Sequence, residues 1–272
     1  MSWWLAAAMG VVQGVTEFLP ISSSAHLRIL PALFGQQDPG ASFTAVIQIG
    51  TIFSVLIYFK NDLISISKAT LMGIFSRNQR NKEFKMGLSI ILATLPIIFF
   101  GYFGQDFIKN GARDLYIVAY VMLIFSFVMF LVDKYSKFDT DINELSRFKV
   151  LMLGFAQSLA LIPGFSRSGV TITAARFFGI NRADAARFSF LLSVPAIVLS
   201  GLYEAIGITN SNESGWGQTI FASAVSFVVG YLSIAWLIKW LGNHSLKTFV
   251  IYRIALALVI IALLNGGIIS NL

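Results

Sequence analysis

No cysteine occurs anywhere in this sequence of 272 residues, and charged side chains are scarce. Without thiols the chain can form neither a disulfide framework nor a thiolate metal site. Only 12% of the residues are charged and 56% are hydrophobic, whereas a soluble domain is about 25% charged. Together with a mean hydropathy of +0.76, this composition predicts an integral membrane protein.

Basic residues are also missing from the start of the chain, where Arg28 is the first cation. A cleaved signal peptide begins with a basic segment, so we expect none here. The sequence lacks the G-x-x-x-x-G-K loop of soluble nucleotide chemistry. Its net charge of +7 would suggest nucleic acid in a soluble protein, but in a membrane protein it indicates basic loops facing an anionic leaflet. We therefore expect no nucleic-acid partner.

Long apolar runs, by contrast, are abundant. Six of them are about long enough to cross a hydrocarbon core of roughly 30 Å as helices. These runs cover residues 42–59, 86–104, 114–133, 186–206, 217–238 and 249–269. Cations concentrate in segments 60–85 and 134–149, which we expect to be cytoplasmic loops, whereas segments 29–41 and 207–216 contain none and are expected outside.

Two further apolar stretches, 3–20 and 150–164, are interrupted by Pro20 and Pro163. The charge pattern leaves one net crossing between residues 149 and 207, and the run 186–206 already supplies it. The second stretch must therefore enter and leave the membrane on one face, as a re-entrant helix pair does. We expect the first stretch to behave in the same way.

A weak internal repeat relates these two stretches. The segment MGVVQGVTEFLPISSS from Met9 aligns, with one gap, with LGFAQSLALIPGFSRS from Leu153. The two copies join the rest of the chain on opposite sides, which predicts an inverted-topology repeat of about residues 1–133 and 148–272 in a single membrane domain. The expected fold is an all-α polytopic membrane protein with about six transmembrane helices and two re-entrant helix pairs.

Serine clusters follow both prolines and predict an anion-binding site. The serines of Ser22–Ser24 can cap one new helix, and Ser166 and Ser168 can cap another. The first backbone N–H groups of a helix lack intrahelical partners and favour an anion. Between the latter two serines, Arg167 offers a planar fork of donors that suits a phosphate or diphosphate.

Glu17 and His26 add ionisable groups to this apolar region. Such a group at membrane depth costs about 2.5–3.5 kcal/mol on insertion scales, so it indicates function by default. Glu17 can act as a general base or hold a divalent cation, and His26 suits proton transfer near neutral pH. Beside such a base, Ser23 can become a nucleophile toward phosphorus. The bland alternatives are a structural ion pair of Glu17 with an arginine and a packing role for His26.

At these residues the sequence resembles the bacterial undecaprenyl-diphosphate phosphatase family of the bacitracin-resistance type, along nearly the whole chain. Gln13 and Glu17 fit the family motif in which Glu or Gln is followed four residues later by Glu. PGFSRSGVT, from Pro163 to Thr171, fits the second motif, P-G-x-S-R-S-x-x-T, without departure. The run EFLPISSSAHL is similar to the family's serine and histidine segment.

This resemblance implies hydrolysis of undecaprenyl diphosphate to undecaprenyl phosphate and inorganic phosphate, which recycles the carrier for cell-wall synthesis and confers bacitracin resistance. It further implies a bacterial inner-membrane location, a site open to the outer face, a divalent cation (Mg²⁺ or Ca²⁺) and a homodimer as one oligomeric option. By the same resemblance Ser23 is the nucleophile, Glu17 and His26 are its acid and base partners, and Arg167 clamps the phosphate. A histidine nucleophile or an activated water would use the same residues.

Polar residues around this core complete the expected site. Glu17 is the expected metal ligand, and the expected substrate-binding residues are Gln13, Ser22, Ser24, Gln48, Ser166, Ser168 and Thr171. Arg253 lies within an expected span and either lines the pocket or sits at the inner interface close to Lys247. The alternative functions are a transporter or flippase for a phosphorylated polyprenyl lipid, which needs no nucleophile, and a purely structural membrane protein.

Overall fold

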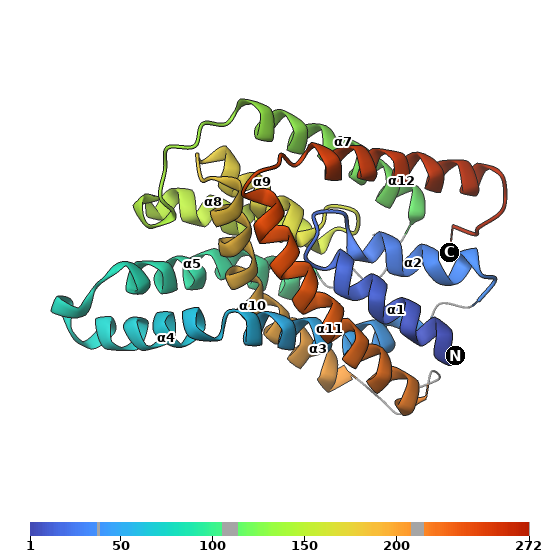
Figure 1. The fold of residues 1–272 in the computed structure, drawn as a ribbon, viewed down its shortest axis with the longest axis horizontal. Coiled ribbons are helices and arrows are strands. Elements are labelled where there is room, and N and C mark those ends of the chain that lie inside the picture. The colour runs from blue at the N-terminus through green and yellow to red at the C-terminus, as the bar shows by residue number, and fades with distance from the viewer. Residues whose placement is uncertain (37–38, 105–113, 208–214, 272) are drawn as a thin grey trace.

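The computed structural model describes residues 1–36, 39–104, 114–207 and 215–271, and within them every regular element is a helix (Figure 1). Short 3₁₀ turns connect some of the α-helices. The α-helices are α1 (Trp3–Thr16), α2 (Ser23–Leu33), α3 (Gly40–Tyr58), α4 (Lys60–Phe75), α5 (Lys82–Phe103), α7 (Leu115–Tyr135), α8 (Arg147–Ser158), α9 (Arg167–Phe177), α10 (Arg182–Gly207), α11 (Trp216–Leu241) and α12 (Lys247–Asn265).

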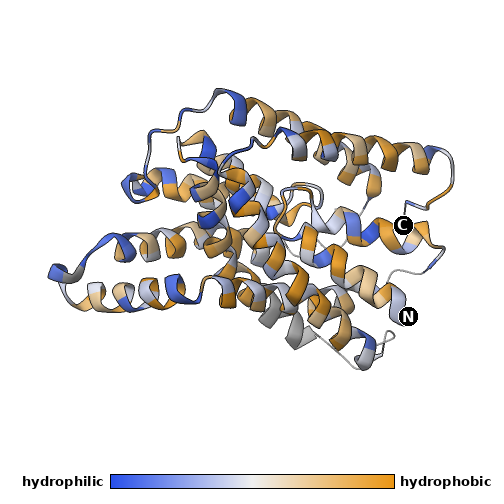
Figure 2. Ribbon diagram, viewed as in Figure 1, coloured by the Kyte–Doolittle hydropathy of each residue, from blue (hydrophilic) through white to orange (hydrophobic). Residues whose placement is uncertain are grey.

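Several of these helices are suited to a bilayer. In the described part of the chain, α5, α7, α11 and α12 are each long and apolar enough to cross a membrane. Together, Phe43–Tyr58 of α3 and α4 would make a fifth span, bent by 75° where the two helices meet. Figure 2 shows apolar residues along the middle of the bundle and hydrophilic ones gathered toward one end. The expected polytopic, all-α membrane fold is thus confirmed, and α10 covers the predicted run 186–206.

The cation-rich segment 60–85 is not the loop that its charges predict. α4 occupies most of it and α5 begins at Lys82, so the two helices project together as a hairpin (Figure 1). Gly73 and Gly87 allow this close approach, because a Cβ on Gly73 would meet the Phe84 ring at 2.2 Å. A count of cations orients a segment but does not decide its secondary structure, and apolar residues between these cations favour a helix.

The predicted outer segments are only partly described. Segment 29–41 begins inside α2 and includes residues 37–38, which lie outside the described residues. Most of segment 207–216 also lies outside them. Their expected position on the outer face therefore stays a prediction.

Both predicted helix breaks are present. The first falls between α1 and α2, at residues 17–22, and the second follows a 3₁₀ turn, Leu159–Leu161, that extends α8 and leads to α9. α1 packs on α11, whereas α8 packs on α5. The two breaks thus lie inside the bundle, enclosed by protein, which is the condition for irregular backbone at membrane depth.

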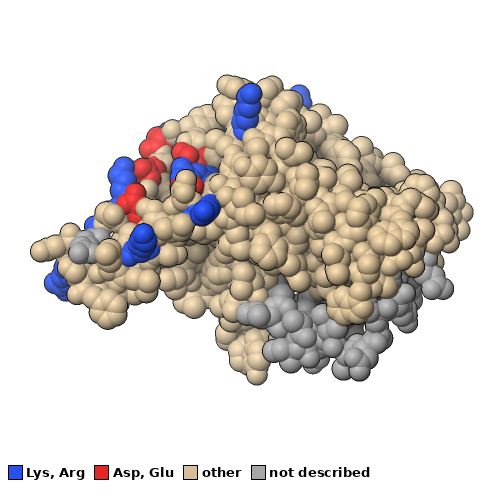
Figure 3. All heavy atoms as spheres, turned by 60° about the horizontal axis from the view of Figure 1, so that its bottom comes forward, with Lys and Arg blue, Asp and Glu red and all other residues tan. Residues whose placement is uncertain are grey.

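A buried ion cluster ties several helices together at the charged end of the bundle. Asp133, on α7, is 5% exposed and accepts hydrogen bonds from Arg176 Nε at 3.3 Å and Arg182 Nε at 2.7 Å. It also accepts one from the backbone N–H of Leu246, just before α12, at 2.9 Å. Figure 3 shows other charged side chains gathered at this end, while the rest of the visible face is mostly uncharged.

Candidate active site

Each break ends at a serine in the left-handed backbone region, which turns the chain sharply into the next helix. Ser22 precedes α2 with φ of 75°, and Ser166 precedes α9 with φ of 70°. Residues other than glycine seldom adopt this conformation, and it is often found at functional sites. Ser23 and Arg167 are the first residues of their helices, so both stand at N-termini that favour anions.

The expected capping by serine is confirmed at one break and wrong at the other. Ser166 Oγ accepts a hydrogen bond from Gly169 N at 3.2 Å and so caps α9. Ser22 makes no side-chain cap to α2. Its hydroxyl lies 3.1 Å from Ser24 Oγ. The N–H groups at the start of α2 therefore lack the cap that those of α9 have.

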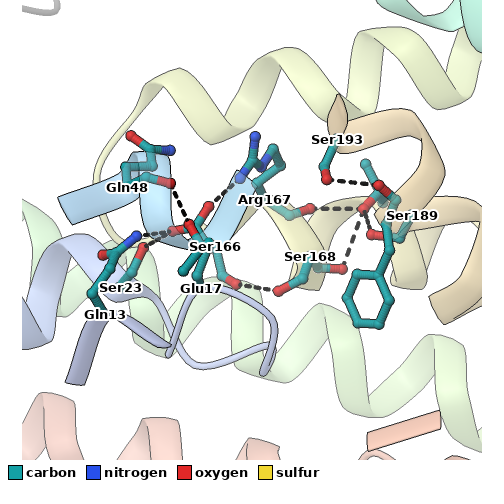
Figure 4. A network of polar contacts seen from close by, with 12 residues as sticks. Gln13, Glu17, Ser23, Gln48, Ser166, Arg167, Ser168, Ser189 and Ser193 are labelled. Carbon is teal, nitrogen blue, oxygen red and sulfur yellow. Dashed lines mark hydrogen bonds and ion pairs between the residues drawn. The ribbon is translucent and has the colours of Figure 1, made fainter. Parts of the chain in front are cut away.

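Glu17 is the centre of a polar network that joins the two breaks (Figure 4). Its Oε2 accepts hydrogen bonds from Ser23 Oγ at 3.0 Å and from Gln13 Nε2 at 3.1 Å. Its Oε1 forms an ion pair with Arg167 Nη2. The carboxylate thus contacts a hydroxyl from its own break and a guanidinium from the other.

This ion pair is largely shielded from solvent. The side chain of Glu17 is 6% exposed and that of Arg167 is 15% exposed. The alternative of a structural ion pair at Glu17 is therefore realised, but its partner is the arginine expected to hold phosphate. The Glu17–Arg167 contact is thus compatible with both a structural ion pair and a phosphate site, because it brings the two breaks together.

Further contacts between the breaks surround this pair. Ser168 Oγ donates to the carbonyl of Leu19 at 3.1 Å and lies 3.2 Å from Ser166 Oγ. Thr171 is fully buried, and its hydroxyl donates to the Arg167 carbonyl at 2.8 Å and contacts Ser189 Oγ. Thr171 therefore supports α9 from behind and does not face an accessible site.

Gln48 lies at the edge of the network, on α3 (Figure 4). Its side chain is half-buried, and its backbone carbonyl accepts a hydrogen bond from Thr51 Oγ1 at 2.7 Å. Ser24, the second residue of α2, is exposed. A substrate-binding role for Gln48 and Ser24 therefore remains a proposal.

His26 makes its described contacts away from Glu17. Its Nδ1 lies 2.7 Å from the carbonyl of Ser22, and since a carbonyl only accepts, Nδ1 carries the proton. In the neutral ring Nε2 then accepts from the Tyr252 hydroxyl, which lies 2.7 Å away. The two rings are stacked, with centroids 5.6 Å apart. The structure therefore links His26 to α12, and Glu17, not His26, contacts the Ser23 hydroxyl.

Arg253, also on α12, is placed differently from either expectation. It is fully buried and neither lines an open pocket nor reaches an interface. Its guanidinium donates to the carbonyls of Gly164 at 2.8 Å, and of Pro20 and Phe165 at 3.4 Å, and to Ser126 Oγ at 2.9 Å. It thus satisfies backbone carbonyls that the breaks remove from helical hydrogen bonding. A lone cation within an apolar run was the sequence signal for such a role.

The donor set fits a metal only in combination with a substrate. Among the described residues no group of three or more His, Cys, Asp or Glu side chains lies together. Glu17 contributes a carboxylate, and Gln13 directs its amide nitrogen toward it. Mg²⁺ is often bound through one or two carboxylates plus substrate phosphates, and a metal at Glu17 would need such phosphate ligands.

A polytopic helix bundle in which two broken helices bring a carboxylate, a hydroxyl and a guanidinium together defines an integral membrane protein with an internal polar site. The chain matches the family model of bacitracin resistance protein BacA over residues 6–259, and it belongs to that family. The family resemblance expected from the two motifs is therefore confirmed.

Curated relatives match nearly the whole chain. A protein of Corynebacterium efficiens is 47% identical over 98% of this chain and 92% of its own length. Proteins of Nocardioides sp. and Mycolicibacterium smegmatis are each 43% identical, with 97% and 99% of both chains covered, respectively. All three are named undecaprenyl-diphosphatase.

Proposed function

We propose that this protein is an undecaprenyl-diphosphatase, which removes the terminal phosphate of undecaprenyl diphosphate and regenerates the monophosphate carrier for cell-wall synthesis. The observation that carries this proposal is the Glu17 carboxylate, bound at once by the Ser23 hydroxyl and the Arg167 guanidinium. Family membership and the name shared by relatives of similar length support it. Release of the carrier in this way accounts for bacitracin resistance, which the family name records.

Ser23 is the proposed nucleophile and Glu17 its base. The hydroxyl already donates to the carboxylate at 3.0 Å, within the range for proton transfer. As Ser23 Oγ bonds to the terminal phosphorus, its proton passes to Glu17 and the P–O bond to undecaprenyl phosphate breaks. That proton is passed on to the departing undecaprenyl phosphate, so Glu17 is a carboxylate again. Water then attacks the phosphoserine and gives a proton to Glu17, which returns it to Ser23 Oγ as the bond to phosphorus breaks and inorganic phosphate leaves. Direct attack by water held at Glu17 would use the same residues.

Arg167 is the proposed phosphate clamp. Its guanidinium stands at the N-terminus of α9, where the helix dipole also favours an anion. When the diphosphate enters, it takes over guanidinium donors now turned to Glu17, and the carboxylate is left free to accept the serine proton. Gln13, Ser22, Ser24, Gln48, Ser166 and Ser168 are proposed to orient the remaining phosphate oxygens.

His26 is proposed to handle protons at the leaving group. Its fixed Nδ1–H leaves Nε2 as the atom that exchanges a proton, with Tyr252 as its resting partner. Glu17 is proposed to hold a divalent cation, Mg²⁺ or Ca²⁺, jointly with diphosphate oxygens, and the ion would neutralise charge on the phosphates.

The proposed location is the bacterial inner membrane, with the site opening outward. Cations of the α4–α5 hairpin and of the segment after α7 gather at one end of the bundle (Figure 3). By the positive-inside rule this end faces the cytoplasm, so substrate would reach the breaks from the other side. A homodimer is compatible with this arrangement and is tested by the molecular mass in detergent.

The deciding experiment uses the purified full chain in detergent, undecaprenyl diphosphate and Mg²⁺ or Ca²⁺, with released phosphate as the readout. Ser23→Ala and Arg167→Ala are expected to lose activity by about 10²-fold or more, as removal of a nucleophile or a charge stabiliser does. Ser67→Ala and Arg77→Ala are matched controls, because both residues are exposed at the charged end. Full activity in either site variant would reject the mechanism.

Transport of a phosphorylated polyprenyl lipid is the second candidate. Broken helices that meet at an anion site are also the architecture of secondary transporters. Movement of a labelled polyprenyl phosphate between the leaflets of vesicles that contain the protein distinguishes transport from phosphatase activity. A transporter needs Arg167 but no nucleophile. Lipid movement that persists in Ser23→Ala, without phosphate release by the parent protein, would favour transport.

A further inference from the structure

An open hollow lies at the charged end of the bundle, apart from the two breaks. Its volume is about 560 Å³, within the range of roughly 300–1,000 Å³ that is usual for small-ligand sites. The end of α7, the connection that follows it, the start of α8 and the end of α9 form its walls. We call it the α7–α9 hollow, lined among others by Leu131, Val132, Lys137, Lys149 and Phe177.

The hollow combines an apolar wall with a cationic, hydroxyl-bearing rim. Leu131, Val132 and Phe177 form the apolar part, and Lys137 and Lys149 contribute two ammonium groups. The hydroxyls of Ser136 and Thr140 also line it, as does the carboxylate of Asp139, to which Thr140 Oγ1 donates at 3.2 Å. The two lysines and one aspartate give the lining a net positive charge.

Aromatic side chains around the hollow indicate its depth in the membrane. Tyr135 and Phe177 are 69% and 67% exposed, as expected for the ring of aromatic residues that marks a membrane–water interface. Lys134 Nζ lies 5.1 Å from the centroid of the Tyr135 ring, and Lys149 Nζ lies 5.9 Å from that of Phe178. Apolar stems beside rings with ammonium groups at the rim are typical of headgroup level.

The hollow is separate from the proposed catalytic site. Arg167 begins α9 and Phe177 ends it, so the two lie about 15 Å apart along the helix axis, at a rise of about 1.5 Å per residue. A ligand in the hollow therefore contacts the far end of the helix that presents Arg167. It cannot share atoms with a phosphate bound at the two breaks.

We propose that the α7–α9 hollow binds an anionic phospholipid of the surrounding leaflet, with its phosphate between Lys137 and Lys149 and the start of an acyl chain against Leu131 and Val132. Charge complementarity carries this assignment, since basic pockets between helices on the cation-rich side of membrane proteins bind anionic headgroups. The apolar wall selects a lipid over a soluble phosphate. This proposal stands independently of the phosphatase activity.

The test measures binding of phosphatidylglycerol to the delipidated full chain in detergent, by thermal shift and by native mass spectrometry. Phosphatidylcholine with the same acyl chains is the neutral comparison. We expect phosphatidylglycerol to raise the melting temperature at lower concentration than phosphatidylcholine does. The double variant Lys137→Gln with Lys149→Gln should bind phosphatidylglycerol about tenfold to thirtyfold more weakly.

A matched control removes two cations from the same end of the molecule. Lys68→Gln with Lys85→Gln changes the net charge equally, and all four lysines are exposed, so both double variants are expected to fold. Replacing Lys137 and Lys149 by Arg should retain affinity, which checks that charge is responsible.

Three kinds of result would overturn the proposal, and the second kind concerns either of two double variants. The first is equal binding of the charged and neutral lipids by the parent chain. The second is equal weakening in the control double variant, or loss of binding in the Arg pair. The third is a full thermal shift with inorganic phosphate alone, with phosphatidylglycerol adding nothing, because the hollow would then be a simple anion site.

Discussion

The break between α1 and α2 and the break before α9 have the same backbone course but carry different chemistry. Each ends at a serine with positive φ, and a second serine follows two residues later, with the two hydroxyls 3.1 Å apart in the first break and 3.2 Å apart in the second. The residue between the two serines is Ser23 in the first break and Arg167 in the second. The same backbone course thus presents a hydroxyl from one break and a guanidinium from the other, and both contact Glu17.

The likeness extends back along α1 and α8. The same number of residues separates Gly10 from Gly154 as separates Ser22 from Ser166. A Cβ on Gly10 would meet the Ala222 carbonyl of α11 at 2.5 Å, and one on Gly154 the Ala93 carbonyl of α5, also at 2.5 Å. We propose that residues 1–133 and 148–272 form the inverted repeat, because each broken helix packs closely on a helix of the other half.

The largest effect is expected from Glu17→Gln, which removes the charge that links the breaks. Phosphate release should fall by about 10²- to 10⁴-fold, since Glu17 is the proposed base. Stability should also fall, because Arg167 is left shielded without its partner. Glu144→Gln, at an exposed carboxylate, is the control. Undiminished turnover would show that the first break does not supply the base.

Arg253→Met removes a side chain that binds carbonyls of both breaks. Its loss leaves at least three carbonyls without this donor, and a cost of about 3–5 kcal/mol is expected for disrupting a buried charged network. The melting temperature in detergent measures it. Arg253→Lys keeps the charge but not the fork, so it should restore only part of the stability. A parent-like melting temperature for Arg253→Met would mean that the breaks hold together without it.

Gly10→Ala and Gly154→Ala test whether the two halves are equivalent. Both place a methyl group against a backbone carbonyl, and overpacking of this kind costs about 1–3 kcal/mol. Similar decreases in melting temperature are therefore expected. Gly101→Ala is the control, because its Cβ would meet only Leu161 at 3.9 Å, an ordinary contact. A large cost at one glycine and none at the other would contradict the repeat.

The smallest expected effect is a difference in stability between serine variants of the two breaks. Ser166 caps α9 through its side chain and Ser22 does not cap α2. Ser166→Ala should therefore cost about 0.5–2 kcal/mol, the range for losing a cap, and Ser22→Ala less. Thermal unfolding of both variants provides the comparison. Equal costs would indicate that the cap contributes nothing at the second break.

Much of this architecture could be predicted from the sequence. Proline and serine mark both breaks, and glycine marks the second one as well. Apolar length gives the main spans, and all of these signals are local. The meeting of the two breaks, with Ser23 and Arg167 in one site, also followed from placing both breaks inside one membrane, whereas an ion pair of Glu17 with an arginine was only the alternative interpretation. The alignment around Gly10 and Gly154 pointed in the same direction.

What the sequence did not predict depends on packing between distant segments. Arg253 reaches carbonyls that only the folded bundle brings within its range, and His26 meets Tyr252 across most of the chain. The helical course of α4 was missed for another reason. Its cations indicate the side of the membrane on which the segment lies, and on that basis it was predicted as a loop. The apolar residues between the cations, which pack against α5, were not taken as evidence for a helix.

The pairing of Glu17 with Arg167 has a consequence for how the enzyme waits between turnovers. Without substrate, the Arg167 guanidinium is already paired with the Glu17 carboxylate, so no unpaired positive charge is buried in the apolar interior. In the proposed mechanism, an arriving diphosphate displaces Glu17 from Arg167, and the carboxylate that it frees is the proposed base. Substrate arrival and activation of the base are in this way a single exchange of partners.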